Sequence, residues 1–531
     1  MAPGPAPSPT VPPWAAGPSY GDVVVEALTR YPRRDAFVLG ERRATYAEIA
    51  DLVGRTQTVL DELGLRPGGA VGVLSPNAPE VFVVQTAAVL NGARYTGLHP
   101  LSSLEDHVFL CDDAEIEVLV VHPVYAERAA AVAERAASVR HVLSLGPSEA
   151  GPDLLDRCAR TAPRTLRAPD LDQETTAWLQ YTGGTTGTPK GAMVPHRALV
   201  QLAQSVTNSW GLPEAPVYLA ASPITHAAVL PVTAALVRGG TVVLQQGFDP
   251  DGWLTAVETE RVNFAFVVPT MIYALLEKAD PAARDLSSIE TLCYGAAPMT
   301  PQRLVEAQEV FGPVMLQGYG QSESVGMATS LRKDEHDPVG RPDLLTSCGR
   351  PVAGVHIELQ GDDGVPVADG EVGEVCIRSR AVMNGYWKRD EESAQALRGG
   401  WLRTTDLAVR DAEGFLHLVD RKKDMIITGG FNVYPREIED VLTGHESVSQ
   451  AAVVGVPDER WGEAVAAFVV ARAGAEIDVA ALTALVRERK GPHQAPKRVE
   501  IVPELPTTGV GKIDKKALRA VHWAGQTRNV H

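Results

Sequence analysis

The stretch Tyr181-Thr-Gly-Gly-Thr-Thr-Gly-Thr-Pro-Lys-Gly191 is the most distinctive part of the chain. Eight of its eleven residues are glycine or threonine. Glycines let the backbone turn tightly and bring its N–H groups close to an anion, and threonine hydroxyls add donors. Lys190 adds a positive charge suited to a leaving polyphosphate. The phosphate-binding residues expected here are Thr182, Gly183, Gly184, Thr185, Thr186 and Lys190.

The loop differs from the commonest nucleotide motifs. A P-loop needs Ser or Thr directly after its lysine, whereas Gly191 follows Lys190. The dinucleotide fingerprint is also absent. An isolated Gly/Thr cluster is often a plain polar loop, but the density of Gly and Thr and the Pro-Lys-Gly end make that alternative a poor one here.

The chain is long and acidic. Its 531 residues exceed one ordinary hydrophobic core, so we expect two or more domains. The formal net charge of −17 argues against general binding to nucleic acid or to anionic membranes. The five cysteines contain no CxxC pair, and no segment reaches the roughly 20 apolar residues of a membrane span. We therefore expect a cytoplasmic protein without a zinc site, a membrane span or a nucleic-acid partner.

Short apolar runs alternate with Ala-rich helical segments over most of the chain. Strands are expected at residues 70–74, 117–121, 142–145, 241–244 and 264–268. From residue 352 to 378 the runs are separated by Asp-Gly turns, as in a small antiparallel subdomain. The fold class expected is therefore α/β with largely parallel sheets. Residues 425–531 have the size of a small separate α+β domain.

Two further segments suggest boundaries. Residues 1–19 are rich in Pro, Ala and Gly, so we expect a disordered tail, with folded structure from Tyr20 onward. The charged cluster Asp420-Arg-Lys-Lys-Asp424 lies between two ordered blocks. Taken alone, such a cluster is more often a solvated turn than a hinge.

Four segments downstream of the loop match parts of a nucleotide. Tyr294-Gly-Ala-Ala-Pro298 offers small residues on which a flat ring can lie. In Gln317-Gly-Tyr-Gly-Gln-Ser-Glu323, Tyr319 can stack on a purine, Ser322 can bond phosphate and Glu323 can hold Mg²⁺. Trp401-Leu-Arg-Thr-Thr-Asp406 ends in an acid suited to ribose hydroxyls, and Pro506-Thr-Thr-Gly-Val-Gly-Lys512 presents a lysine on a Gly-rich loop. Each is weak alone, but five segments in one order are specific.

In this order the segments resemble the acyl-adenylate-forming superfamily of acyl-CoA synthetases, nonribosomal peptide adenylation domains and beetle luciferases. The resemblance covers nearly everything after residue 20, and residues 420–439 look most like the hinge region of acyl-CoA ligases. It implies a large N-terminal domain of layered α/β subdomains at 20–420, a hinge at 421–424 and a small mobile α+β domain at 425–531. It also implies ATP, Mg²⁺ and coenzyme A as cofactors and a small-molecule carboxylic acid as substrate.

The resemblance implies a reaction in two halves. A carboxylate attacks the α-phosphorus of ATP, which gives an acyl-adenylate and pyrophosphate, and the thiol of CoA then attacks the acyl carbonyl. The implied catalytic residues are Lys512, which stabilises developing charge, Glu323, which holds the metal, and Lys423, the hinge residue. The implied nucleotide- and CoA-binding residues, besides the phosphate loop, are Gly295, Ala296, Ala297, Gly318, Tyr319, Gly320, Gln321, Ser322, Asp406, Arg421, Gly429 and Gly430.

The acid itself is predicted only as a class. Amino-acid-activating relatives carry an early Asp for the substrate ammonium, whereas Ser222-Pro-Ile-Thr-His226 contains no carboxylate. His226 resembles a histidine beside the acyl pocket of fatty and aryl acid ligases, although a structural histidine is a fair rival interpretation. Gly295 and the two alanines after it would leave a roomy pocket. A fatty, aromatic or terpenoid acid is therefore expected.

The chain departs from the family pattern at Thr405, where relatives have glycine, and at Ser322, where they have threonine. A Cβ atom at Thr405 is expected to crowd the backbone or to shift Asp406. Both departures concern the nucleotide, so two alternatives stay open: an enzyme that performs only one half-reaction, or a noncatalytic adenylate-binding protein. The PxxxxGK form around Lys512 also suggests regulation by a lysine acetyltransferase, because acetylation removes the charge.

Overall fold

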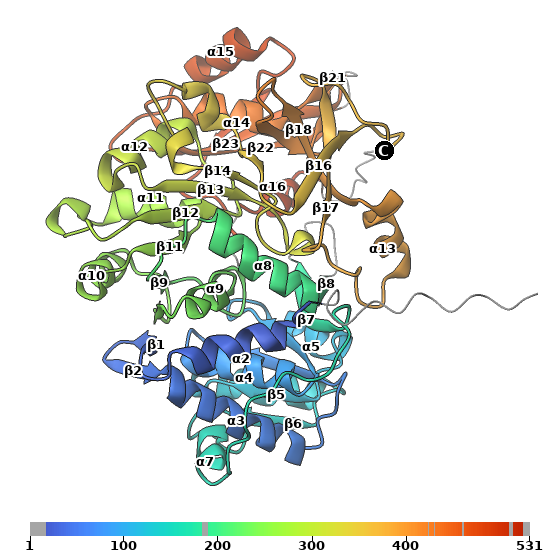
Figure 1. Ribbon diagram of the computed structural model, residues 1–531. Coiled ribbons are helices and arrows are strands. Elements are labelled where there is room, and N and C mark those ends of the chain that lie inside the picture. Colours follow the sequence, from blue (N-terminus) through green and yellow to red (C-terminus); the bar gives the residue numbers. More distant parts are fainter. Residues whose placement is uncertain are drawn as a thin grey trace, which may run out of the picture.

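The computed structural model describes residues 17–182, 189–422, 424–428, 431–458, 461–508 and 513–523. Over this part of the chain the strands form four sheets, and helices cover both faces of the two mainly parallel ones (Figure 1). The expected α/β fold is confirmed. Strands β3 and β10 have the predicted bounds, Ala70–Leu74 and Thr241–Leu244.

The N-terminal part of the chain contains the two mainly parallel sheets. The helices of the N-terminal part are α2 (Tyr20–Arg30), α3 (Tyr46–Glu62), α4 (Pro79–Leu90), α5 (Leu104–Asp113), α6 (Ala126–Arg135), α7 (Leu154–Ala159), α8 (His196–Ser209), α9 (Val232–Val237), α10 (Pro250–Glu260), α11 (Pro269–Lys278), α12 (Pro301–Phe311) and α13 (Asp390–Ala396). The first sheet has the order β6 (His141–Ser144), β5 (Val118–Val121), β3, β4 (Arg94–Leu98), β7 (Thr176–Thr182) and β8 (Lys190–Pro195). The central sheet has the order β15 (Arg350–Pro351), β14 (Thr329–Leu331), β13 (Met315–Tyr319), β12 (Thr291–Gly295), β11 (Phe264–Val267), β9 (Val217–Ala220), β10, β1 (Asp35–Leu39) and β2 (Arg42–Thr45).

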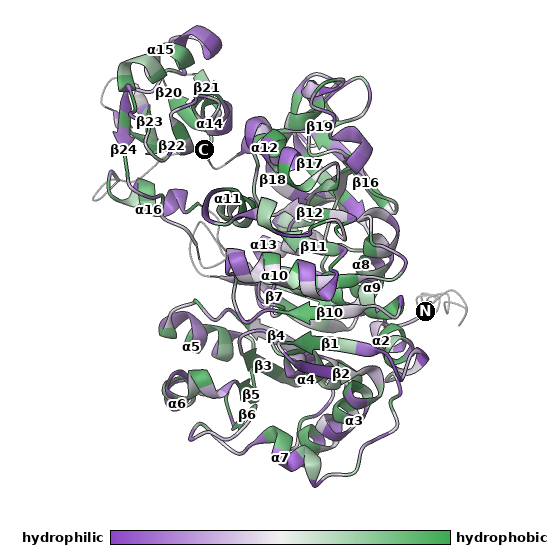
Figure 2. Cartoon of the chain, turned by 90° about the vertical axis from the view of Figure 1, so that its left-hand side faces the viewer, coloured by the Kyte–Doolittle hydropathy of each residue, from purple (hydrophilic) through white to green (hydrophobic). Residues whose placement is uncertain are grey.

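An antiparallel sheet follows, as the Asp-Gly turns predicted. It has the order β16 (Val355–Gln360), β17 (Val372–Ser379), β18 (Leu402–Arg410) and β19 (Leu416–Arg421). The C-terminal elements form a separate lobe at the upper left of Figure 2. Its helices are α14 (Pro435–Thr443), α15 (Val479–Lys490) and α16 (Lys515–Ala520). Its sheet has the order β21 (Phe431–Val433), β20 (Ile426–Thr428), β23 (Gly462–Ala471) and β22 (Val448–Asp458), with β24 (Arg498–Ile501) paired to β23.

Local sequence explains the main helices. Ser19 caps α2 and Thr45 caps α3, each with an acidic residue three positions later that completes a capping box. Ser19, which the sequence placed in the tail, therefore belongs to the folded part. Helix α4 is buried along its whole length because it lies between the first and the central sheet. Phe82 of α4 contacts Phe37 of β1, with ring centroids 5.3 Å apart.

The two parallel sheets meet near the carboxyl ends of their strands, which is where ligands bind in open α/β sheets. At Gly97 of β4, a Cβ atom would lie 2.4 Å from the carbonyl oxygen of Thr225, in the loop after β9. Asn77, after β3, donates its side-chain amide to the carbonyl oxygens of Ala220 at 3.1 Å and Ser222 at 2.8 Å, and accepts from the backbone N–H of Ile224 at 2.7 Å. Asn77 thus fixes the loop that carries His226.

The C-terminal lobe contacts helices α11 and α12. Arg303 of α12 pairs with Glu277 and donates to Ser449 Oγ at 3.2 Å, while Arg472 donates to Glu306 Oε1 at 3.2 Å. These contacts fix the orientation of the lobe in this conformation. Among the described helices, none combines the length and the apolar character needed to cross a bilayer.

Candidate active site

The phosphate loop joins two paired strands. Thr182 at the end of β7 and Lys190 at the start of β8 are opposite each other in an antiparallel ladder. Gly183, Gly184, Thr185 and Thr186 lie outside the described residues. The ends of the loop therefore meet beside the carboxyl edge of the first sheet, where an α/β fold places phosphates.

A tyrosine links the start of β8 to Glu323. The amine of Lys190 lies over the Tyr386 ring, 5.3 Å from its centroid, and the Tyr386 hydroxyl donates to Glu323 Oε1 at 2.8 Å. Burial, followed by the nearby Glu323 carboxylate, raises the pKa of Tyr386, so its hydroxyl stays a donor. Backbone bonds from Met383 N–H to the Glu323 carbonyl and from Trp387 N–H to the Gly191 carbonyl position this segment.

The structure also brings together the predicted ribose residues. Asp406 and Arg421 are partners across β18 and β19, with Arg421 Nε 3.2 Å from Asp406 Oδ1. The hydroxyl of Tyr319, at the end of β13, donates to the other carboxylate oxygen at 2.8 Å. Burial raises the pKa of Tyr319 well above its usual value, which keeps this hydroxyl protonated. An aromatic ring and an acid thus share one corner of the site.

Glycines between β12 and β14 allow close backbone contacts. A Cβ on Gly295 would lie 2.4 Å from the Gly318 carbonyl oxygen, and one on Gly320 would lie 1.9 Å from the Gly326 carbonyl oxygen. A Cβ on Gly318 would meet the side chain of Met327. Ala296 and Ala297 follow β12, and Gln321 caps the short helical turn Ser322–Ser324 that carries Glu323. The predicted residues of these two motifs therefore lie at neighbouring strand ends.

Strained backbone is concentrated in the same motifs. Among the described residues other than glycine, those with positive φ are Glu115, Arg261, Ala296, Val325, Lys388 and Thr405. Ala296, Val325 and Thr405 lie within or directly beside the nucleotide motifs. Thr405 has φ of 63°, a left-handed conformation that costs a β-branched residue energy, and it is held there by a bond from its N–H to Glu374 Oε1 at 3.0 Å. The sequence expectation of crowding at Thr405 thus takes the form of backbone strain.

Replacing Thr405 by glycine is expected to stabilise the protein by about 1 kcal/mol, because glycine adopts this φ without steric cost. The net gain is limited by the greater freedom of glycine in the unfolded chain. A raised unfolding midpoint in urea would confirm the prediction. As a matched control, Thr259→Gly on the exposed face of α10 should destabilise, since its backbone is helical. A lower midpoint for Thr405→Gly would contradict the assignment of strain.

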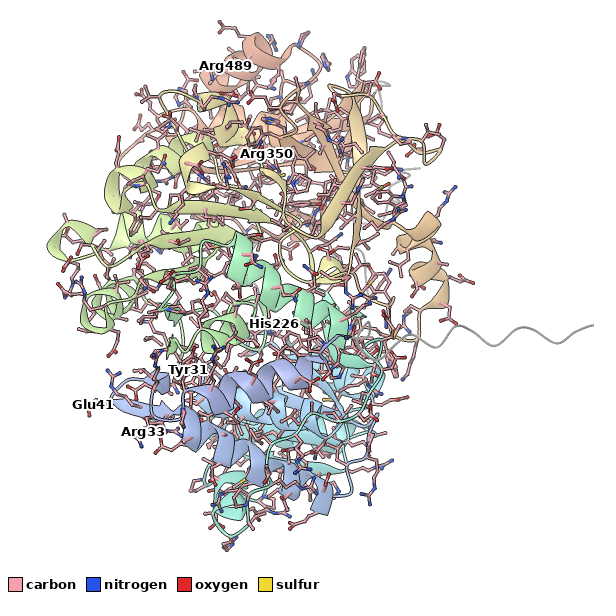
Figure 3. The ribbon with its side chains drawn as sticks, in the orientation of Figure 1. Tyr31, Arg33, Glu41, His226, Arg350 and Arg489 are labelled. Carbon is pink, nitrogen blue, oxygen red and sulfur yellow. The ribbon has the colours of Figure 1, made fainter. Side chains whose placement is uncertain are left out.

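His226 lies between the two parallel sheets (Figure 3). Its ring contacts that of His99 edge to face, with centroids 4.6 Å apart, and its Nδ1 lies 2.9 Å from Thr225 Oγ1. Burial, and next the neighbouring His99, lower the pKa of His226 to about 3. The imidazole is therefore neutral at physiological pH, so it can line an acyl pocket without attracting the carboxylate as an ion pair.

Several predicted residues of the C-terminal part lie outside the described residues: Lys423, Gly429, Gly430 and Lys512. Their surroundings are described in part. Arg519 of α16 pairs with Asp424, and Lys515 pairs with Glu439 at 2.7 Å. Burial raises the pKa of Asp420 to about 6. The side chain of Asp420 also accepts from the N–H of Arg436, at the start of α14.

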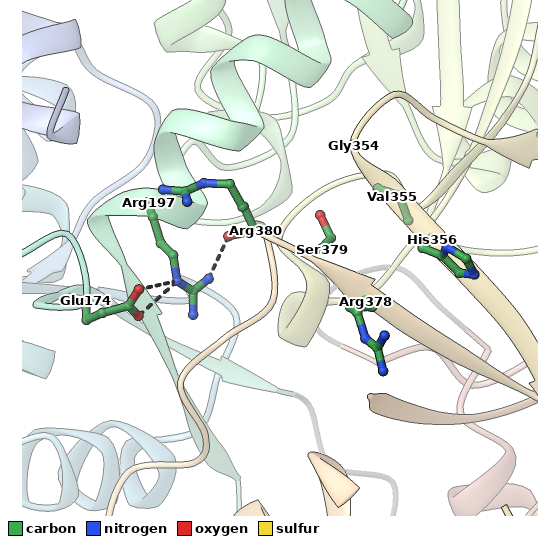
Figure 4. Close-up of a pocket in the computed structure, with 8 residues that line it drawn as sticks. All are labelled: Glu174, Arg197, Gly354, Val355, His356, Arg378, Ser379 and Arg380. Carbon is green, nitrogen blue, oxygen red and sulfur yellow. Dashed lines mark hydrogen bonds and ion pairs between the residues drawn. The ribbon is translucent and has the colours of Figure 1, made fainter. Parts of the chain in front are cut away.

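An open hollow of about 600 Å³ lies away from these motifs, between β16, β17 and the start of α8 (Figure 4). Arg197 in its wall is already bound to Glu174 and to the carbonyl oxygen of Arg380. Arg378 stacks on Trp401, and its guanidinium points away from that of Arg380 (Figure 4). The cations of this hollow therefore do not converge on one ligand, and it contains none of the predicted site residues.

A magnesium ion fits the carboxylate chemistry of the site. No group of three or more His, Cys, Asp or Glu residues that could cage a metal occurs within the described ranges. Mg²⁺ commonly binds one or two carboxylates and completes its shell with substrate phosphates and water. A single buried carboxylate, Glu323, oriented by Tyr386, matches that mode.

Sequence reasoning missed Tyr386, Asn77 and His99. Tyr386 contacts both Lys190 and Glu323, and the signal that could have drawn attention to it is the aromatic pair in Asn384-Gly-Tyr-Trp387. Asn77 follows β3, a strand that the sequence predicts, and His99 follows β4. Polar residues at that position are candidates for a ligand edge.

Comparison with known proteins agrees with this geometry. Residues 24–387 match the AMP-binding enzyme family, and residues 437–512 match the AMP-binding enzyme C-terminal domain. The chain belongs to the AMP-binding enzyme family of adenylate-forming enzymes. Within it, the chain is similar to the medium/long-chain-fatty-acid–CoA ligase FadD8 of Mycobacterium tuberculosis, with 42% identity over 96% of this chain and 91% of that protein.

Two further relatives are similar to this chain over most of their length. A feruloyl-CoA synthase of Amycolatopsis is 38% identical over 92% of this chain and 96% of that protein. The structure of the amide bond synthetase McbA from Marinactinospora thermotolerans superposes with a TM-score of 0.87 and 36% identity, covering 94% of this chain and 99% of that chain. The chain is an acid–CoA ligase of the AMP-forming type by these relationships.

Proposed function

We propose that the protein activates a hydrophobic carboxylic acid, fatty, aromatic or terpenoid, as an acyl-adenylate and transfers the acyl group to CoA. The observation that carries the proposal is the pairing of two clusters at the strand ends. One contains Asp406, Tyr319 and Arg421, and the other contains Glu323, Tyr386 and Lys190. The first suits a nucleoside and the second a metal-bound polyphosphate.

Each of these residues has a separate role in the first half-reaction. Asp406 accepts hydrogen bonds from ribose hydroxyls while Arg421 and Tyr319 hold its carboxylate in place. Lys190 and the phosphate loop guide the departing pyrophosphate. A magnesium ion, when bound, neutralises phosphate charge, and Glu323 would be its protein ligand. Lys512 would stabilise the charge that develops during transfer.

In the second half-reaction the C-terminal domain would turn about 421–424. Gly429 and Gly430 would then face the site and leave room for the pantetheine arm of CoA. Residues 487–498 are rich in Arg, Lys and His, which makes them a candidate site for the CoA phosphates, and a solvated helix face is the alternative. Lys490 at the end of α15 is paired with Glu437, which favours the alternative for this residue, and Arg498, which lies on β24 rather than on a helix, is paired with Glu500. Acetylation of Lys512 and a cytoplasmic location remain predictions of the sequence.

Half-reaction assays test the proposal. ATP–pyrophosphate exchange is measured with a panel of hydrophobic acids, beside thioester formation with and without supplied acyl-adenylate. Exchange and thioester together support the full ligase. Thioester from supplied adenylate alone supports a single half-reaction, and neither activity supports a noncatalytic protein. Exchange without thioester would contradict CoA as acceptor and direct attention to an acceptor that forms an amide, because the structural relative McbA is an amide bond synthetase.

Replacing Tyr386 by phenylalanine removes the hydroxyl that orients Glu323. The Mg²⁺ concentration for half-maximal exchange is expected to rise several-fold, because loss of a hydrogen bond to a charged group costs about 1.5–3 kcal/mol and neighbouring groups compensate in part. Tyr125→Phe, a tyrosine far along the chain in the turn Pro123–Tyr125, is the matched control. An unchanged Mg²⁺ requirement would contradict the role of Tyr386.

A further inference from the structure

Beneath His226 the structure contains a small, largely enclosed cavity that the reaction described above does not use. Its walls include Gln85 of α4, Tyr95 of β4 and Trp178 of β7, and His226 and Thr225 close one side. Its free volume is about 10 Å³. That space holds one oxygen-sized group, such as a water molecule or the terminal oxygen of a ligand.

Three buried hydrogen-bond donors belong to these walls. Within the described residues, no hydrogen-bond partner is found for Gln85 Nε2, Tyr95 Oη or Trp178 Nε1. Buried polar groups are almost always paired, by protein or by ordered water. Three unpaired donors on residues that line one cavity therefore point to an acceptor within that cavity.

The walls are rigid enough to hold such an acceptor. Tyr95 and Trp178 are direct partners across β4 and β7, so their side chains leave the same face of the sheet, with ring centroids 6.3 Å apart. Tyr20 packs edge-on against Trp178, with a centroid distance of 5.8 Å, and its hydroxyl is bound to Thr233 Oγ1 at 2.7 Å. Burial raises the pKa of Tyr95, which keeps its hydroxyl a donor.

We propose that Gln85, Tyr95 and Trp178 form a binding site for a single hydrogen-bond-accepting oxygen at the floor of the acyl pocket. The oxygen belongs either to an ordered water molecule or to a hydroxyl, ether or carbonyl group at the far end of the acid. This inference rests on the proposed function only in placing the acid beside His226. A polar floor favours acids with a distal oxygen over hydrocarbon acids of the same skeleton, because a methyl group would leave the donors unpaired.

The first test does not depend on activity. A crystal structure of the full chain at about 1.5 Å resolution or better is expected to contain one ordered oxygen bonded to Tyr95 Oη and Trp178 Nε1, either as water in the free protein or as part of the acid in its complex. Tyr95→Phe is expected to lose that oxygen or displace it, with the fold retained. A cavity without density in both the free protein and the complex would overturn the proposal.

The second test separates the two sources of the oxygen. Acids of one skeleton, with and without a distal hydroxyl, are compared by kcat/KM for pyrophosphate exchange. If the acid supplies the oxygen, the wild type should prefer the hydroxylated acid by about fivefold to tenfold, and Tyr95→Phe should remove that preference. If water supplies the oxygen, the ratio of kcat/KM between the two acids stays near one and the water is seen in the complex. Tyr31→Phe, outside the cavity, is the control and should change neither measurement.

These outcomes are distinct from failure of the proposed function. A protein without exchange activity toward any acid would refute the ligase, while the ordered oxygen in the free protein would still establish the site. Conversely, an active ligase with an empty cavity and no preference between the paired acids would refute the site alone. Trp178→Phe gives a second variant in case Tyr95→Phe fails to fold, since it removes a different donor from the same cavity.

Discussion

A Lys512→Ala variant is expected to lose about 100- to 1,000-fold in ATP–pyrophosphate exchange while keeping most of its thioester formation from preformed acyl-adenylate. The reason is that the lysine would stabilise charge that develops only during adenylation, and removing one such group typically costs 10²–10³ in kcat. The measurement is both half-reactions on the same preparation.

Lys516 provides the matched control. It is an exposed lysine on α16, close along the chain to Lys512 and beyond the Gly-rich loop. Lys516→Ala should leave both half-reactions unchanged. Equal loss of the two half-reactions in Lys512→Ala would contradict a role confined to adenylation. Retention of both would remove Lys512 from the mechanism altogether.

An Asp406→Asn variant is expected to lose about tenfold to 100-fold in kcat/KM for ATP, because hydrogen bonds to a charged group contribute about 1.5–3 kcal/mol each. Asparagine keeps the size of the side chain but loses the charge that holds Arg421 at 3.2 Å. It also places an amide donor where the Tyr319 hydroxyl now donates. Nucleotide affinity should therefore fall more than the rate at saturating ATP.

The folded state should survive this change. Arg421 keeps a side chain 43% exposed to solvent, so loss of its partner does not leave a buried unpaired charge. A melting temperature close to that of the wild type, measured with the kinetics, would confirm this. Asp251→Asn on the exposed side of α10 is the control and should leave ATP kinetics unchanged. An Asp406→Asn variant with wild-type affinity for ATP would remove the ribose role.

The sequence was most informative where one segment alone determines the structure. The run Thr241-Val-Val-Leu244 predicted a strand with the bounds that the structure has, and the capping-box spacing of Thr45 and Glu48 in the sequence coincides with the start of α3. The resemblance placed Asp406 and Arg421 in one nucleotide site, and the structure has them as partners across β18 and β19.

The remaining features depend on contacts between distant segments. Tyr386 reaches Glu323 because the segment after β17 lies along β8, through backbone bonds that no local pattern encodes. The unpaired donors of Tyr95 and Trp178 lie beside one another only because β4 and β7 are neighbouring strands. Thr405 was expected to crowd its surroundings, but only the backbone dihedral shows that the strain lies in its own conformation.

The contacts around residues 420–424 have a mechanical consequence. Asp420 is bound to the N–H of Arg436 on one side, and Asp424 is bound to Arg519 on the other. The proposed pivot is thus very short, and the lobe beyond it extends to α15, where Arg489 lies near the tip in Figure 3. A short pivot with a long arm acts as a lever: rotation about a few backbone bonds would sweep the tip through a wide arc.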